Sequence, residues 1–90
     1  MNKDTENIIN NHVLGYVKEG VKNAIVELLL KLQKENKKFE ISTIDGNVVY
    51  GNEFNTPLHG REYEDYFYVY INDIVVAKIY YDTILEIRGH

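Results

Sequence analysis

The spacing of apolar residues changes once along this chain, from a helical period to an alternating one, close to Lys38. Residues 4–36 carry apolar side chains three and four positions apart, which predicts a long amphipathic helical segment. Residues 38–88 alternate between apolar and polar, which predicts strands. Because no repeat or linker interrupts the 90 residues, we expect one α+β domain, with an N-terminal helical extension over 1–20 and a core over 21–90.

The helical stripe leaves the number of helices open. Its members are Ile8, His12, Val13, Tyr16, Val17, Val21, Ala24, Ile25, Leu28, Leu29 and Leu32. Gly15 and Gly20 each weaken a helix by about 1 kcal/mol relative to alanine, so the segment is either one helix or two joined near Gly20. At the other end, Asn36 is expected to stop the helix, since asparagine tolerates the left-handed conformation found there.

Turn residues divide the second half into five expected strands. The second begins at Val48, has Gly51 inside it and is broken at residues 55–57, and the others are residues 39–44, 66–71, 74–80 and 84–88. The Asp45-Gly46 pair predicts a type I′ hairpin turn, in which both central residues have positive φ. A glycine inside a strand marks a bulge or a bend, so Gly51 predicts a sharp bend in the second strand. Asn72-Asp73 is a second expected turn, and residues 81–83 form a kink. Residues 58–65 are expected to be an exposed polar loop.

Three short stretches resemble a known family. They are the end of the helix at residues 28–35, the strand and turn at 41–46 with a second glycine at Gly51, and residues 79–84 before the last strand. In this order, over residues 28–88, the chain resembles the Sm-like (LSm) superfamily, and within it the bacterial RNA chaperones called Hfq. The resemblance implies a five-stranded, strongly bent, SH3-like barrel that assembles into a hexameric ring and binds RNA.

The chain departs from this family at its RNA-contacting positions. Tyr81 and Asp82 stand where the family has a lysine and a histidine, Ile25 replaces a glutamine, and Ser42 replaces a tyrosine. The resemblance therefore implies that the scaffold is kept while the two main RNA surfaces have diverged. What remains is a basic rim at the end of the helix. The candidate RNA- or nucleotide-binding residues are Lys31, Lys34, Lys37, Lys38, Tyr80, Tyr81 and Asp82.

Charge is distributed unevenly. Residues 1–38 have seven lysines and five carboxylates, a net charge of +2, whereas residues 39–90 have three cations and nine carboxylates, a net charge of −6. Because an acidic sheet repels phosphate, nucleic acid is expected to bind near the basic rim. The alternative hypothesis is an acidic, phage-type inhibitor that blocks a nucleic-acid-related protein partner. Its candidate surface is Glu62, Tyr63, Glu64, Asp65 and Tyr66, although the same run also fits a solvated loop.

The sequence lacks the motifs of several other classes of protein function. There is no cysteine, no phosphate-binding glycine loop, no cofactor motif and no arrangement typical of a nucleophilic enzyme, so we expect no catalysis and no metal. His59 has acidic neighbours that suit either a metal or acid–base site or an ordinary polar loop. The many tyrosines of the sheet suit either base stacking or a half-buried surface. Without a signal peptide or an apolar span, a cytoplasmic protein with no membrane contact is expected.

Overall fold

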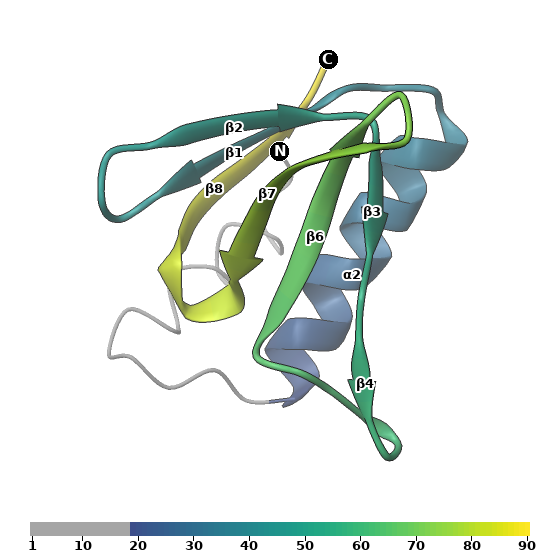
Figure 1. The fold of residues 1–90 in the computed structure, drawn as a ribbon, viewed down its shortest axis with the longest axis vertical. Coiled ribbons are helices and arrows are strands. Elements are labelled where there is room, and N and C mark those ends of the chain that lie inside the picture. Colours follow the sequence, from purple (N-terminus) through teal and green to yellow (C-terminus); the bar gives the residue numbers. More distant parts are fainter. Residues whose placement is uncertain (1–18) are drawn as a thin grey trace.

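Residues 19–90 are described by the computed structural model, so the predictions for the helical stripe and extension before Glu19 lie outside the described residues. Helix α2 (Glu19–Lys34) runs along two small antiparallel sheets (Figure 1). Because α2 begins at Glu19, at the edge of the described residues, the question of one helix or two joined near Gly20 also lies outside them. Its apolar face buries Ile25, Leu29 and Leu32 against the strands, as the sequence stripe predicts.

The end of α2 confirms the prediction for Asn36. This residue has φ of 56°, and its backbone N–H donates to the carbonyl of Gln33 at 3.1 Å. The N–H of Lys37 donates to the carbonyl of Leu32 at 2.9 Å. The two bonds make a Schellman motif, which stops the helix and directs the chain into the first strand.

Two three-stranded sheets follow the helix, and every strand pair in them is antiparallel. The first sheet has the order β2-β1-β8, and the second has the order β3-β6-β7. A separate hairpin pairs β4 with β5. The strand bounds are β1 Phe39–Thr43, β2 Val48–Gly51, β3 Glu53–Asn55, β4 Leu58–His59, β5 Glu62–Tyr63, β6 Tyr66–Ile71, β7 Ile74–Tyr80 and β8 Ile84–Gly89.

The expectation of five strands in a closed barrel is corrected in two places. The second expected strand is divided at Asn52 into β2 and β3, which belong to different sheets. The expected polar loop at 58–65 contains the β4–β5 hairpin. Within residues 19–90 there are thus eight strands in open sheets. A short 3₁₀ helix, η1 (Tyr81–Thr83), joins β7 to β8 and confirms the expected kink.

The bend at Gly51 is confirmed, and its cause is close packing. A Cβ atom at this position would lie 2.1 Å from Val69 Cγ1 and 3.0 Å from the carbonyl oxygen of Tyr70. The next residue, Asn52, donates its backbone N–H to that same carbonyl at 2.9 Å. Any side chain larger than hydrogen would therefore push the two sheets apart.

The two hairpin turns differ from each other. The type I′ prediction for Asp45-Gly46 is wrong, because only Gly46 has positive φ, at 87°. The Gly46 N–H instead donates to the Thr43 carbonyl at 3.0 Å, and the chain re-enters the ladder at Asn47, so the loop is longer than a two-residue turn. Asn72 and Asp73 do form the predicted tight turn, with φ of 49° and 68°. Asn and Asp tolerate this conformation better than other non-glycine residues.

One hydrophobic core lies between the helix and the sheets. The alternation in β1 is confirmed, since Phe39, Ile41 and Thr43 are buried. The fully buried side chains with the largest volumes include Tyr81, Phe39 and Phe67. The apolar cluster consists of Ile25, Val26, Leu29, Leu32, Phe39, Ile41, Phe67, Val69, Ile79, Tyr81, Ile84 and Ile87.

Candidate functional site

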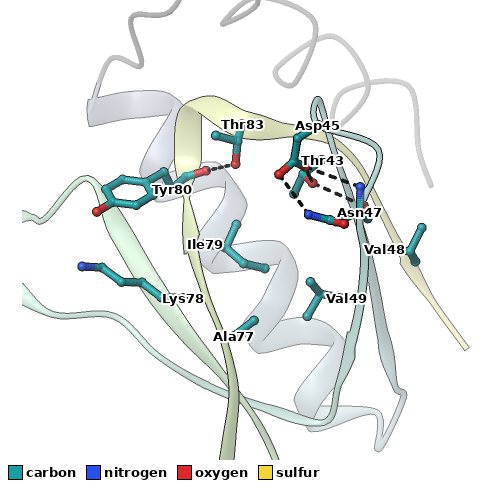
Figure 2. Close-up of a pocket in the computed structure, with 10 residues that line it drawn as sticks. All are labelled: Thr43, Asp45, Asn47, Val48, Val49, Ala77, Lys78, Ile79, Tyr80 and Thr83. Atoms are coloured by element: carbon teal, nitrogen blue, oxygen red, sulfur yellow. Dashed lines mark hydrogen bonds between the residues drawn. The ribbon is translucent and has the colours of Figure 1, made fainter.

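A groove opens between the β1–β2 hairpin and β7, with a volume of about 420 Å³ (Figure 2). Val49, Ala77 and Ile79 form its apolar wall, and the side chains of the β1–β2 loop and of Thr83 form a polar rim. Figure 2 shows that Lys78 and Tyr80 extend away from the polar rim, so their charged and aromatic groups do not converge with it.

The polar groups of this groove are engaged in turns. Asp45 accepts hydrogen bonds from the Thr43 hydroxyl, from Asn47 Nδ2 at 2.9 Å and from the Asn47 backbone N–H at 3.4 Å. The Thr43 bond is the main reason that the pKa of Asp45 is lowered. Thr83 Oγ1 donates to the Tyr80 carbonyl at 2.7 Å. The groove therefore offers a surface whose rim hydroxyl, amide and carboxylate groups already take part in hydrogen bonds of the turns.

The basic rim, defined as Lys31, Lys34, Lys37 and Lys38, is exposed along its whole length. Lys37 Nζ lies 3.1 Å from Glu35 Oε2. Within the part of the chain that the structure describes, the other three ammonium groups have no ion pair. The backbone of Lys38 exchanges hydrogen bonds of 3.0 and 2.9 Å with His90, which holds the rim against the end of β8. Lysines at a helix C-terminus also favour the helix dipole, so a stabilising role accompanies any binding role.

The other three candidate RNA-binding residues lie away from the rim. Tyr80, Tyr81 and Asp82 are at the η1 end of β8, whereas Lys38 is beside its other end. Six residues of β8 separate the two groups, a length of about 20 Å. Tyr81 is fully buried, with its ring 5.0 Å from that of Phe67, so it is a core residue and has no surface to offer a base. Tyr80 is 45% exposed and Asp82 is half-buried.

A cluster of tyrosines around Lys78 covers the outer face of β6 and β7. Lys78 Nζ lies 4.0 Å from the ring centre of Tyr66 and 5.3 Å from that of Tyr80. Tyr66 makes edge-to-face contacts with Tyr68 at 5.6 Å and with Tyr80 at 5.7 Å. The hydrogen bond with Tyr80 is the main cause that raises the pKa of Lys78. Sequence reasoning missed Lys78, although its register opposite Tyr68 follows once the turn at Asn72-Asp73 is accepted.

The acidic candidate surface is held in place by Lys22. This lysine is buried on α2, and its Nζ lies 2.8 Å from Asp65 Oδ1 and 3.2 Å from the Tyr63 carbonyl oxygen. The Asp65 side chain is 84% exposed. Glu62 is also exposed, whereas Tyr63, Glu64 and Tyr66 are half-buried. The surface therefore presents the exposed carboxylate of Glu62 and that of Asp65, which is exposed but paired with Lys22. Sequence reasoning missed Lys22, because it borders the apolar stripe and reads as a surface residue.

His59 lies on the surface, close to one carboxylate. The His59 side chain is 90% exposed, and its Nδ1 lies 3.6 Å from Glu64 Oε1. Residues 19–90 contain no group of three or more histidine or acidic side chains that could hold a metal ion.

Among residues 19–90, no helix has the length and apolar character needed to cross a membrane. Comparisons with protein families, curated proteins and solved structures find nothing that matches this chain.

Proposed function

We propose that this chain is a non-catalytic, Sm-like, homo-oligomeric protein that binds RNA or nucleotides through the basic rim. The observation that carries the proposal is the exposure of four lysines within eight residues, three of which have no ion pair within residues 19–90. A lysine whose charge is not neutralised by a carboxylate is available to a phosphate. The charge distribution agrees with this placement, because the acidic half of the chain disfavours phosphate elsewhere.

The sheets support the oligomeric part of this proposal. Within the described residues, β7 and β8 each pair with a neighbouring strand on one side only. The free edge of β7 exposes Ile74, Val75 and Val76, and β8 exposes Leu85. Unpaired apolar edges favour pairing with another chain. We propose that β7 of one copy pairs with β8 of the next and that this closes a ring, most simply a hexamer.

Fluorescence anisotropy with a labelled single-stranded RNA tests the binding. At 50 mM salt we expect binding that weakens steeply at 200 mM, since each phosphate neutralised by a lysine releases counterions. The triple variant Lys34→Glu, Lys37→Glu and Lys38→Glu should lose the affinity. Arg61→Glu is the matched control for the single reversal Lys34→Glu, because it also reverses an exposed cation. If Lys34→Glu and Arg61→Glu weaken RNA binding equally, RNA does not bind specifically at the basic rim.

The anchored acidic segment favours a second candidate, an inhibitor that occupies the basic groove of a protein partner. The observation behind it is the exposure of the Glu62 carboxylate and of the Asp65 carboxylate, which Lys22 holds in place. This candidate predicts no RNA affinity even at 50 mM salt. It also predicts binding of an arginine-rich peptide that Glu62→Lys abolishes and Lys34→Glu leaves intact. RNA binding that depends on the basic rim argues against it.

A further inference from the structure

A second, smaller cavity of about 160 Å³ lies directly beside the basic rim. It is lined by Lys38, Tyr50, Gly51, Asn52 and Ile71. These residues meet where β2 passes into β3 and where β6 ends. Lys38 thus belongs both to the rim and to the cavity wall, so a ligand held by the rim has the cavity within reach.

The cavity wall has the composition of a site for a flat ring. Tyr50 is 52% exposed and Ile71 is 39% exposed, so both present apolar surface to a ligand. Gly51 contributes no side chain, because the close approach of Val69 excludes one. An apolar cavity of roughly 150 Å³ is large enough to hold benzene. The space beside Tyr50 is therefore of the size that one aromatic ring system fills or partly enters.

One residue of the wall, Asn52, has a buried acceptor that suits a ligand with an N–H group. Asn52 Oδ1 is buried and accepts no hydrogen bond from the described residues. The Nδ2 of the same amide donates to Asn72 Oδ1 at 3.4 Å. A buried acceptor without a donor is unfavourable, and a small rotation of the amide toward a bound N–H would relieve this.

We infer that this cavity binds a nucleobase, stacked on Tyr50 and hydrogen-bonded to Asn52, while the attached phosphate lies on Lys38. The inference rests on the proposed function, because the rim must first bring RNA or a nucleotide to this surface. Every base offers a flat face to an aromatic ring, and adenine and cytosine offer an amino group to the amide oxygen. The cavity adds recognition of the base to the recognition of phosphate by the rim.

Isothermal titration of the full chain with AMP and with ribose 5-phosphate tests this inference. Wild type should bind AMP more tightly, because only AMP has a base. Tyr50→Ala should weaken AMP binding about 5- to 100-fold, bringing it close to that of ribose 5-phosphate, while Tyr50→Phe keeps the ring and the affinity. Tyr68→Ala is the matched control, since Tyr68 is a partly exposed tyrosine on the other sheet. Equal affinities of wild type for the two ligands would overturn the inference.

Amide NMR spectra give a second readout that does not depend on a variant's stability. The backbone amides of Gly51 and Asn52 should shift on addition of AMP and stay in place with ribose 5-phosphate. If the lysine variants abolish RNA binding but Tyr50→Ala leaves RNA and AMP binding unchanged, the cavity is not the base site and the proposed function stands. If wild type binds neither RNA nor AMP at 50 mM salt, both proposals are overturned.

Discussion

Gly51 is the residue at which the first sheet passes into the second, and no other amino acid fits there without moving Val69. A Cβ atom would lie 2.1 Å from Val69 Cγ1 and 3.0 Å from a backbone oxygen. We expect Gly51→Ala to lower the free energy of unfolding by about 1–3 kcal/mol and Gly51→Val to impair folding. In both variants the added side chain would overlap Val69, which already packs closely against the backbone. Urea unfolding followed by circular dichroism measures the change.

Gly20→Ala provides the control for this glycine. No atom lies within 4 Å of a Cβ added at Gly20, so the substitution should be tolerated and, within a helix, should not lower stability. If the Gly51→Ala protein is as stable as the Gly20→Ala protein, the sheets can accommodate a methyl group at residue 51. That result would contradict the close contact between Gly51 and Val69.

The lowered pKa of Asp45 predicts that the stability of the fold depends on pH. The Thr43 hydroxyl bond holds the pKa of Asp45 below its ordinary value of 3.8 in the folded protein. A carboxylate with a lowered folded-state pKa stabilises the fold above the ordinary value, and this contribution is lost as the pH falls through the lowered pKa. NMR titration should place the Asp45 midpoint below 3.8, and Thr43→Val should move it upward. An unchanged midpoint in the Thr43→Val protein would contradict the assigned cause.

At the scale of elements, the left-handed residue that ends α2 should decide how well the helix is terminated. Asn36 has φ of 56°, where alanine costs about 1 kcal/mol or more and glycine costs little. We therefore expect Asn36→Ala to lower the melting temperature and Asn36→Gly to leave it unchanged or higher. Differential scanning calorimetry measures both, and equal melting temperatures for the two variants would count against the Schellman ending.

The segment around β4 and β5 depends on Lys22 for its position. Replacing this lysine by alanine removes the contacts with Asp65 and with the Tyr63 carbonyl and leaves a gap on the helix. We expect Lys22→Ala to cost about 1–2 kcal/mol and to increase amide hydrogen exchange over residues 58–65. Asn23→Ala, at an exposed neighbouring position, is the control and should leave the exchange unchanged. Equal exchange in both variants would mean that the segment is held by other contacts.

The elements with regular patterns were predictable from the sequence. β6 and β7 match the expected bounds, and the turn between them follows from Asn72-Asp73, because local propensity decides all three. The division at Asn52 was not predictable, since a strand shared by two sheets has the same alternation as one long strand. The burial of Tyr81 was also missed. Tyr81 was a candidate because it stands where the resembling family has an RNA-contacting lysine, whereas it lies in η1 with its ring buried in the core.

The same distinction holds for the candidate site. The lysines of the basic rim could be named from charge alone, because a helix end near solvent is visible in the sequence. The cavity beside Lys38 could not, since Tyr50 and Ile71 are 21 positions apart and meet only where the two sheets adjoin. Contacts of this kind depend on tertiary packing, which local patterns do not specify.

At the scale of the whole molecule, β7 and β8 each have an edge that pairs with no other strand within residues 19–90. Ile74 is 68% exposed and Val75 is 51% exposed on one edge strand. We expect the double variant Ile74→Lys and Val76→Lys to yield a monomer of 10.5 kDa, as measured by light scattering after gel filtration, because charges on an edge oppose strand pairing. Lys substitution at Leu58, exposed on the β4–β5 hairpin, should leave the assembly intact.

Sedimentation of a fluorescently labelled RNA together with the full chain tests oligomerisation and RNA binding in one measurement. At 50 mM salt we expect the RNA to sediment with a particle containing several copies of the chain. At 200 mM salt we expect most of it to return to the position of free RNA. RNA that sediments alone at 50 mM salt, or that sediments with a single copy of the chain, would contradict an oligomeric protein that binds RNA through its basic rim.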